Sequence, residues 1–502
     1  MNLATILENS ARFFPDKAAI IEDEKTYTYR DFNDYASRLA SILVEYGVQP
    51  GDYVGFCAPN SYDWVALYFG ALKCGAVAVT FSYRLTKNEF QKILLDCKPS
   101  ILFTTESRLP DLEYTESRYR PDLVITEKGD NSCIKLAEKG DPLFKTVDRE
   151  RDDIAAILYT GGTTGSPKGA MLTHQNILYP IANVARYERS SEKDITLCFL
   201  PLNHVFGQMH VVNSTIYSSG SIIIQPSFNM EMALEAISRY EVSKFFAVPT
   251  IYIRMLEIPD LKEKLKSVTY CFSAASSMAA EVVRAWKAKT GLNIHESYGL
   301  TESASIVTFN HYHRHVIGSV GTPANLMEIQ IRDRLGKTLE QGEVGEICIR
   351  GLNIFKGYLN NSKETARAFW FDWFRTGDIG YIDRDGYLFI VDRLKDMIIT
   401  GGENVYPREV EEVLYTRPEV KECTVIGMPD REYGERVTAL IVLSNGNRLD
   451  PAVLKEYLKE HLAGFKIPKD YIAIDELPKT TAGKILKREL KEKLINREIN
   501  QI

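Results

Sequence analysis

The sequence predicts an α/β protein. We expect a large N-terminal domain with layered, largely parallel sheets and a barrel-like β section, followed by a small α+β domain. Strand and helix patterns alternate over the first two-thirds of the chain, short strands separated by turns begin near residue 310, and a third pattern begins near Leu394. At about 100–200 residues per domain, a chain of 502 residues needs more than one domain.

The first two-thirds of the chain alternates between the hydrophobic periods of strands and helices. Residues 26–47 begin extended and continue with apolar residues spaced three and four apart, and Gly47 is a typical helix stop. Strands are then expected over residues 54–59 and 76–81, with a helix between them over residues 64–75. Repeated strand–helix–strand order favours helices layered on parallel sheets.

The section after residue 310 changes to short strands with glycine and aspartate turns, which favours an antiparallel, barrel-like arrangement. These strands are expected over residues 317–323, 327–333, 345–351 and 380–393.

The last hundred residues mix amphipathic helices with strands, and this length suffices for a separate domain. Helices are expected over residues 407–417 and 450–462 and in the basic last 20 residues, and strands over residues 422–429, 437–444 and 471–478. We therefore predict domains over residues 1–393 and 394–502, with a junction near residues 393–396.

Composition excludes several classes of protein. The net charge of -6 disfavours a general nucleic-acid binder, which needs excess lysine and arginine. The eight cysteines form no CxxC pair, which predicts buried, reduced thiols rather than a metal site. The start of the chain lacks a signal-peptide pattern, and the most apolar stretch, Leu67 to Phe81, is too short to span a bilayer. We expect a cytoplasmic protein without stable membrane insertion.

The strongest local motif is a loop of glycines and hydroxyl residues that follows the apolar run IAAILY. Such a loop exposes backbone N–H groups and side-chain hydroxyls, which are the groups that hold a polyphosphate. It is not a Walker A loop, because proline and glycine flank its lysine. The candidate phosphate-binding residues are Thr160, Gly161, Gly162, Thr163, Thr164, Gly165 and Lys168.

This loop resembles the signature of the adenylate-forming superfamily, which includes acyl-CoA synthetases, luciferases and the adenylation domains of nonribosomal peptide synthetases. The resemblance covers nearly the whole chain, with the later motifs in the expected order and spacing. It implies ATP, Mg²⁺ and coenzyme A as cofactors, and an AMP-forming acid–thiol ligase. It also implies a mobile C-terminal domain that reorients between two half-reactions.

The segment from Tyr298 to Glu302 is similar to the superfamily's adenine and magnesium segment. The resemblance implies that Tyr298 and Gly299 bind the adenine, that Thr301 contacts the α-phosphate, and that Glu302 helps coordinate Mg²⁺. A carboxylate beside a phosphate loop suits this hard cation.

Two further segments match superfamily motifs around the domain junction. The resemblance implies that Asp378 accepts hydrogen bonds from the ribose hydroxyls and that Arg393 contacts the same sugar. Lys395 falls at the hinge position. Gly401, Gly402 and Glu403 resemble the loop that approaches the pantetheine thiol after the domain has rotated.

The segment from Leu477 to Lys484 matches the superfamily's terminal motif. By this resemblance Lys484 is the catalytic lysine that bridges the acyl carboxylate and the α-phosphate. A positioned cation lowers the barrier because negative charge accumulates there in the transition state. The presence of Lys484, Glu302 and Asp378 disfavours a non-catalytic nucleotide-binding module.

The acid substrate is less constrained by the motifs. The segment Pro201–Gly220 contains no carboxylate that could pair with an ammonium group, which favours an acid without an amine. The resemblance implies that His204 gates the acyl entrance, and Val248–Thr250 resembles another edge of the pocket. A medium- or long-chain fatty acid is the first expectation. The polar residues Gln208, His210, Asn213 and Ser214 leave an aromatic or oxygenated acid as an alternative.

One segment departs from the superfamily pattern. Residues 272–278 lack the glycine and proline that the superfamily commonly has there, so the shape of that loop is not predicted.

The acyl acceptor is expected to be coenzyme A, with an acyl carrier protein as the alternative. Lys466 and Lys469 could serve either acceptor. A luciferase-type oxygenase is a further alternative that no residue requires.

Overall fold

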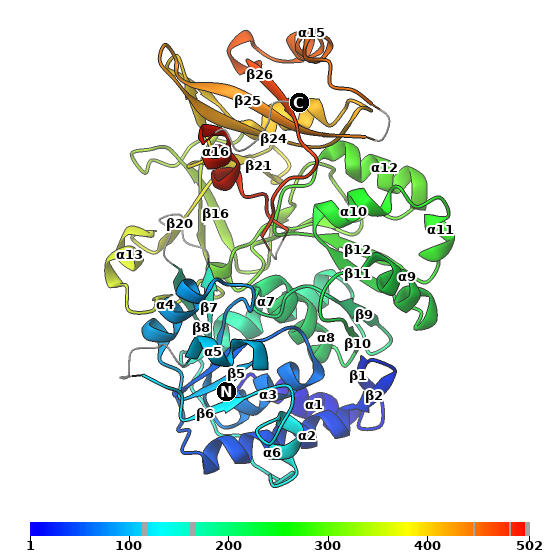
Figure 1. The fold of residues 1–502 in the computed structure, drawn as a ribbon, viewed down its shortest axis with the longest axis vertical. Coiled ribbons are helices and arrows are strands. Elements are labelled where there is room, and N and C mark those ends of the chain that lie inside the picture. Colours follow the sequence, from blue (N-terminus) through cyan, green and yellow to red (C-terminus); the bar gives the residue numbers. More distant parts are fainter. Residues whose placement is uncertain (113–118, 161–166, 445–446, 481–482, 497–502) are drawn as a thin grey trace.

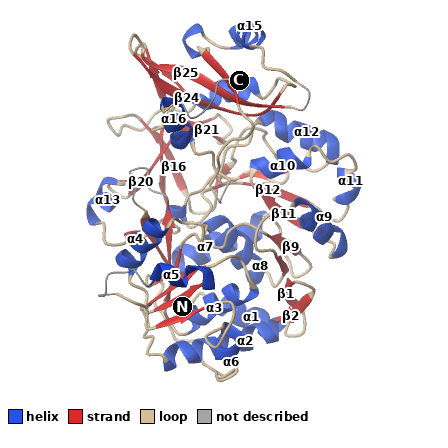
Figure 2. Cartoon of the chain, in the orientation of Figure 1, coloured by secondary structure: helices blue, strands red, loops and turns tan. Residues whose placement is uncertain are grey.

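The computed structural model describes residues 1–112, 119–160, 167–444, 447–480 and 483–496. The chain forms a large N-terminal part and a smaller C-terminal domain that lie at opposite ends of the long axis (Figure 1). Helices pack around the sheets of the large part (Figure 2). The α/β fold class, the barrel-like section and the small α+β domain are confirmed.

A first sheet in the large part has the strand order β13-β12-β11-β9-β10-β1-β2. Its strands are parallel except β2, which pairs antiparallel with β1. The bounds are β1 (Ala18–Glu22), β2 (Lys25–Thr28), β9 (Ile195–Cys198), β10 (Ser221–Ile224), β11 (Lys244–Ala247), β12 (Tyr270–Ser273) and β13 (Ile294–Glu296).

A second sheet has the order β18-β8-β7-β4-β3-β5-β6. It is parallel from β7 to β6 and antiparallel at β8 and β18. The bounds are β3 (Tyr53–Cys57), β4 (Val77–Thr80), β5 (Ile101–Thr104), β6 (Leu123–Ile125), β7 (Ile154–Thr160), β8 (Lys168–Thr173) and β18 (Gly357–Tyr358).

Two helices of the large part match expected helices: α2 lies within residues 26–47, and α3 begins and ends two residues before the expected range 64–75. Thr28 caps α2 in a reciprocal capping box with Asp31, and Gly47 follows the helix with φ +88°. The bounds are α1 (Thr5–Phe13), α2 (Tyr29–Glu45), α3 (Tyr62–Lys73), α4 (Lys87–Cys97), η1 (Glu106–Arg108), α5 (Leu109–Leu112), α6 (Cys133–Ala137), α7 (His174–Tyr187), η2 (Phe206–Asn213), α8 (Ser214–Tyr217), α9 (Met230–Arg239), α10 (Pro249–Met255), α11 (Leu261–Lys264), α12 (Ala280–Thr290), η3 (Thr301–Ser303) and α13 (Ser362–Arg367).

The barrel-like section is an antiparallel sheet with the order β16-β17-β20-β19, in which β21 pairs with β20. The strand expected over residues 317–323 is wrong for most of its length, because only Thr322–Pro323 is paired. Gly321 has φ +93°, and a Cβ at this position would clash with the Phe309 carbonyl. The chain therefore passes close against the backbone of Phe309 here and does not continue as an extended strand. The bounds are β14 (Thr308–Phe309), β15 (Thr322–Pro323), β16 (Glu328–Arg332), β17 (Gly345–Arg350), β19 (Phe369–Trp370), β20 (Trp373–Ile382) and β21 (Leu388–Arg393).

The C-terminal domain has its own sheet, with the order β23-β22-β25-β24 and β26 beside β25. Its core is formed by side chains of the same domain, including Val410, Leu414, Val437 and Leu458. The bounds are β22 (Ile398–Thr400), β23 (Glu403–Val405), α14 (Pro407–Leu414), β24 (Val420–Asp430), β25 (Gly434–Leu443), α15 (Pro451–His461), η4 (Gly464–Lys466), β26 (Asp470–Ala473) and α16 (Lys487–Ile495).

The two parts meet through polar contacts. Arg408 donates from Nη1 to the Ile390 carbonyl at 2.7 Å. Glu412 accepts from the Ala280 backbone N–H at 3.1 Å, and Lys421 pairs with Glu257 at 2.5 Å. The domain junction near residues 393–396 stays a prediction.

The expected burial of cysteine is confirmed. All eight cysteines lie in described segments and are buried free thiols. Burial raises the pKa of Cys57 and of Cys198 to about 12, which keeps these thiols protonated.

The apolar stretch from Leu67 to Phe81 is divided between α3 and β4. Within it, the buried Lys73 pairs with Glu8 at 2.9 Å. Among the described helices, none has the length and apolar character needed to cross a bilayer.

Candidate active site

The fold brings Tyr298, Asp378 and Arg393 together from three separate segments. Tyr298 follows β13, and Asp378 in β20 lies opposite Arg393 in β21. The Tyr298 hydroxyl donates to Asp378 Oδ2 at 2.5 Å, and Arg393 Nε lies 3.4 Å from Asp378 Oδ1. Burial and the Asp378 charge raise the pKa of Tyr298, so the phenol stays a donor. This cluster combines an aromatic ring, a carboxylate acceptor and a cation, which suits a nucleoside.

The Tyr298–Glu302 loop is closed tightly on itself. A Cβ at Gly299 would lie 1.4 Å from the Ser305 carbonyl oxygen, so only glycine fits this position. Thr301 begins the short helix η3, and the Glu302 carboxylate accepts from the Tyr358 hydroxyl at 2.8 Å. Tyr358 therefore fixes the orientation of the Glu302 side chain.

The ends of the predicted phosphate loop lie near this carboxylate. Thr160 ends β7 and Lys168 begins β8, and the Thr160 hydroxyl donates to the Lys168 carbonyl at 3.4 Å. Lys168 Nζ pairs with Glu364 at 2.6 Å and lies 5.3 Å from the centre of the Tyr358 ring. The other predicted loop residues lie outside the described residues: Gly161, Gly162, Thr163, Thr164 and Gly165.

The C-terminal domain places Lys484 in this site. The Thr480 N–H donates to the Lys484 carbonyl at 2.8 Å, and Lys479 forms an antiparallel bridge with Ile485. Burial lowers the pKa of Lys484 to about 8, with a further lowering from the Arg393 charge and an opposing effect of Asp378 and Glu302. An ammonium from the last twenty residues of the chain is therefore held beside the predicted nucleotide residues.

His204 interacts electrostatically with Lys484 and lies in the segment where the acid is expected to bind. Burial and the Lys484 charge lower the pKa of His204 to about 3, so its ring is neutral. His204 Nδ1 accepts from the Phe206 backbone N–H at 3.2 Å, which anchors the ring at the start of η2. This helix has π geometry, a rare conformation that often marks functional sites. The gating role of His204 stays a prediction.

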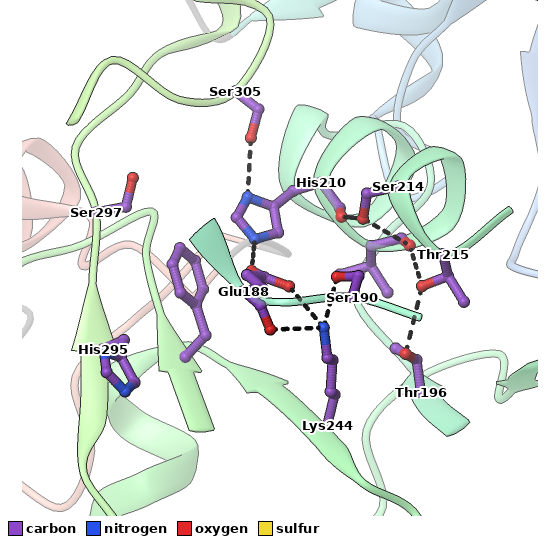
Figure 3. Close-up of polar contacts among 12 residues, drawn as sticks. Glu188, Ser190, Thr196, His210, Ser214, Thr215, Lys244, His295, Ser297 and Ser305 are labelled. Atoms are coloured by element: carbon purple, nitrogen blue, oxygen red, sulfur yellow. Dashed lines mark hydrogen bonds and ion pairs between the residues drawn. The ribbon is translucent and has the colours of Figure 1, made fainter. Parts of the chain in front are cut away.

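The structure adds two residues that the sequence analysis missed, Glu188 and Lys244. His210 Nε2 hydrogen-bonds to Glu188 Oε1 at 2.7 Å, and Lys244 Nζ lies 3.6 Å from Glu188 Oε2 (Figure 3). The Pro201–Gly220 segment lacks a carboxylate, but the fold supplies one from Glu188, just after α7. A lysine in the apolar strand KFFA was the available signal, because buried charges require partners.

The loop over residues 272–278 turns without the usual glycine. Ala275 adopts φ +71°, a conformation that glycine takes without strain and alanine rarely adopts. Phe272, which precedes this turn in β12, packs its ring 4.3 Å from the His210 ring.

The predicted thiol-loop residues lie within the C-terminal domain, in the hairpin between β22 and β23. Gly401 and Gly402 both have positive φ, as a two-residue hairpin turn requires. Gly401 N–H donates to the Tyr433 carbonyl, and Glu403 pairs with Thr400 across the turn. In the described part of the chain, these three residues make their contacts within the C-terminal domain and not with the cluster around Lys484.

The basic residues proposed for the acceptor already have contacts inside the same domain. Lys466 pairs with Glu409 at 2.5 Å, and Lys469 Nζ lies 3.2 Å from the centre of the Tyr433 ring. At the expected hinge, burial and the Arg393 charge lower the pKa of Lys395.

Metal ligands are sparse in the described part of the chain, where no group of three or more His, Cys, Asp or Glu side chains could hold an ion. Glu302 is the one predicted ligand. A single carboxylate fits Mg²⁺, because this ion commonly takes its other ligands from phosphates and water.

The α/β fold has two domains, and the second domain contributes a lysine to a tyrosine–aspartate–arginine cluster. This combination defines an adenylate-forming ligase. Comparison with known sequences agrees. Residues 7–359 match the family described as AMP-binding enzyme, and residues 409–484 match the AMP-binding enzyme C-terminal domain. The chain belongs to this family of AMP-forming acyl-CoA synthetases.

Two curated relatives cover nearly the full chain. A long-chain-fatty-acid–CoA ligase of Bacillus subtilis is 34% identical over 98% of this chain and 94% of its own length. A feruloyl-CoA synthase of Amycolatopsis is 33% identical over 96% of this chain and 97% of its own.

A solved structure shows the same fold in two states. ATP-bound MatB from Rhodopseudomonas palustris is 34% identical and superposes with a TM-score of 0.93 over 99% of this chain and 100% of that one. The apo structure of the same protein covers the same shares with a TM-score of 0.83. The arrangement of this chain is thus closer to the ATP-bound form.

Proposed function

We propose that this enzyme joins a carboxylic acid without an amine to coenzyme A in two half-reactions. The observation that supports this proposal is that the buried Lys484 ammonium interacts electrostatically with Asp378, Glu302 and Arg393 and with His204. A partly desolvated ammonium in that position stabilises the negative charge that develops when a carboxylate attacks phosphorus.

In the first half-reaction a carboxylate oxygen of the substrate attacks the α-phosphorus of ATP, and pyrophosphate leaves. Asp378 and Arg393 hold the ribose, Tyr298 covers the adenine, and Thr160 and Lys168 bind the phosphates with the loop between them. Lys484 neutralises charge at the α-phosphate and the attacking carboxylate. Mg²⁺, held by Glu302, would neutralise the phosphates of ATP.

In the second half-reaction the thiolate of coenzyme A attacks the acyl carbon, and AMP leaves with the bonding electrons. The proposal requires that Lys484 withdraws and that Gly401, Gly402 and Glu403 approach, through rotation near Lys395. We expect Lys395→Pro, which fixes φ, to lower acyl transfer to coenzyme A while pyrophosphate exchange continues. Acyl transfer at the wild-type rate would place the hinge elsewhere, and Lys395→Ala is the control.

Coenzyme A is the acceptor we favour, since the relatives reported above are named for it. The acyl carrier protein is the second candidate. Lys466 and Lys469, which could have served either acceptor, are engaged by Glu409 and Tyr433, so they do not distinguish the two candidates.

The same two relatives differ in the class of acid for which they are named. One is named for a fatty acid and the other for the aromatic acid ferulate, and their identities to this chain are nearly equal. The medium- or long-chain fatty acid was the first expectation. The phenylalanine rings around His210 favour the aromatic alternative. A cytoplasmic location is also proposed, supported by the buried free thiols.

The test is ATP–pyrophosphate exchange with fatty, aromatic and amino acids, followed by mass-spectrometric detection of the thioester formed with coenzyme A or with a carrier protein. We expect exchange with an acid that has no amine, and a thioester with coenzyme A. Absence of exchange with every acid would overturn the proposed ligase activity, and a peak on an amino acid would overturn the substrate class.

A further inference from the structure

The segment from β18 to the start of α13 contacts both halves of the predicted ATP site. The Phe355 N–H donates to the Glu302 carbonyl at 2.8 Å. Strand β18 pairs antiparallel with β8, and the Leu359 N–H donates to the Gly169 carbonyl at 2.8 Å. One short stretch of backbone therefore joins the end of the phosphate loop to η3, the helix that carries the predicted metal ligand.

Tyr358 lies at the centre of this segment. A phenol is protonated at neutral pH, so its hydroxyl is the donor in the 2.8 Å contact to Glu302 Oε1. The Tyr358 ring packs 4.8 Å from the Phe355 ring, and the Tyr358 N–H donates to Thr365 Oγ1 at 2.9 Å. Because its backbone and its ring are both held, the hydroxyl is presented to Glu302 in a set position.

The face of the same ring meets the lysine of the phosphate loop. Lys168 Nζ lies 5.3 Å from the centre of the Tyr358 ring, within the range of a cation–π contact. Lys168 also pairs with Glu364 at 2.6 Å, and Glu364 is fixed in the first turn of α13, where its N–H donates to Asn361. Tyr358 thus separates the predicted phosphate cation from the predicted metal carboxylate.

The hydrogen bond from Tyr358 makes the two oxygens of the Glu302 carboxylate unequal. Oε1 accepts from the phenol, whereas Oε2 accepts no hydrogen bond from any residue in the part of the chain that the structure describes. A cation that binds both oxygens has to compete with the phenol for Oε1. A cation that binds one oxygen can use Oε2 without that competition.

Divalent cations differ in this preference. Mg²⁺ requires near-octahedral geometry and takes single oxygens from carboxylates, phosphates and water. Ca²⁺ is larger, accepts six to eight ligands and often takes both oxygens of one carboxylate. A carboxylate with one oxygen engaged by a fixed phenol therefore favours Mg²⁺.

We propose that Tyr358 is a positioning residue that makes the ATP site selective for Mg²⁺ over Ca²⁺, because its hydroxyl leaves Glu302 one oxygen for the metal ion. This inference rests on the proposed function, in which Glu302 holds the ion. It deepens that function by naming the group that selects the ion. Tyr358 acts through Glu302 and does not itself contact the ion.

The test is calorimetric titration of the whole enzyme with ATP in excess Mg²⁺ or excess Ca²⁺, without any acid, so that no turnover occurs. We expect the wild type to bind ATP more tightly with Mg²⁺. Tyr358→Phe keeps the ring and removes only the hydroxyl. It should weaken binding with Mg²⁺ by about tenfold and change binding with Ca²⁺ by less than about twofold, because loss of a group that orients a metal ligand commonly costs 10–100-fold in affinity.

The Glu302→Gln background tests whether Tyr358 acts through the carboxylate. In that background Tyr358→Phe should cause no further loss of Mg²⁺-dependent ATP binding, because the carboxylate that it orients is already absent. Strictly additive losses would overturn the positioning role.

Tyr35→Phe is the matched control. The Tyr35 hydroxyl also donates to a carboxylate, that of Asp63 at 2.7 Å, but in the contact between α2 and α3. We expect this variant to keep the wild-type preference between the two cations. Titration with AMP without metal should give the same affinity for the wild type and Tyr358→Phe. A tenfold loss of AMP binding would mean general damage to the nucleotide pocket and would overturn the inference.

Equal binding with Mg²⁺ and Ca²⁺ in the wild type, or a preference that survives Tyr358→Phe, overturns the inference even if thioester is formed. An equal loss with both cations also overturns it. A Mg²⁺ preference that disappears in Tyr358→Phe, without pyrophosphate exchange on any acid, supports the inference and counts against the ligase activity. The two proposals therefore fail separately.

Discussion

The nucleotide side and the acid side of this site are built in different ways. On the nucleotide side, Asp378 meets Tyr298 and Arg393 through single contacts, and the Arg393 side chain is 39% exposed. On the acid side, Glu188 and Lys244 are almost fully buried and neutralise each other. Charges that face a ligand serve binding and catalysis. Charges that face each other hold a neighbouring group in place, so their loss should affect specificity and stability first.

The largest expected effect lies on the nucleotide side. Lys484→Ala should lower adenylation about 10²–10⁴-fold, because the cation is lost where charge develops in the transition state. Transfer from a supplied acyl-adenylate to coenzyme A should fall far less. Pyrophosphate exchange and single-turnover thioester formation measure the two steps. An equal loss in both, with the fold intact, would contradict the assignment.

The acid side should lose stability instead. Lys244→Met leaves the Glu188 carboxylate without its neutralising partner and should lower the free energy of unfolding by about 3–5 kcal/mol. Adding Glu188→Gln should restore part of that loss. Urea denaturation measures both.

The control for this experiment is Lys421→Met. Lys421 pairs with Glu257, whose side chain is 54% exposed, so its loss should cost less than about 1 kcal/mol. Strictly additive effects of Lys244→Met and Glu188→Gln would show that the two charges are not coupled.

A smaller effect is expected at the ribose position. Asp378→Asn keeps an acceptor for Tyr298 but removes the charge beside Arg393, and should raise the KM for ATP about 10–100-fold. The KM for the acid should stay near its wild-type value. Initial-rate kinetics with each substrate varied in turn measures this, and a change confined to the acid would reverse the comparison.

The smallest effect is one of pH. The lowered pKa of Lys484, about 8, keeps the ammonium charged below that pH and neutral above it. In the free enzyme, kcat/KM for ATP should therefore be level below pH 8 and fall about tenfold per unit above it. Lys484→Arg should remove this fall, because a guanidinium stays protonated. Retention of the same fall in the variant would assign it to another group.

The two sides also differ in how far the sequence predicts them. Tyr298, Asp378 and Lys484 each lie in a short continuous motif, so the sequence alone points to them, although their roles stay predictions. Glu188 was missed because it follows α7 at the start of a polar stretch that resembles a surface turn. Its contact with His210 spans 22 residues and arises only when α7 and η2 pack together. Local patterns cannot report such a contact.

Other differences have equally local causes. The expected strand over residues 317–323 is interrupted at Gly321, where the chain passes close against the Phe309 carbonyl. Lys466 and Lys469, expected to be available for an acceptor, contact residues that only the folded domain brings near. Charge and hydropathy in the sequence indicate what a side chain can do, but not which neighbour already occupies it.

The segment that carries Lys484 and the hairpin that carries Gly401 and Gly402 are both joined to β25. The hairpin pairs with β25 through Thr400 and Gly434, and the Lys484 segment follows β26, which pairs with β25 over residues 438–441. In the proposed cycle, a rotation that seats one of them withdraws the other. Formation of the adenylate then always precedes formation of the thioester, because the thiol cannot reach the acyl carbon while the Lys484 ammonium is still in the site. A lysine on an independent loop would impose no such order.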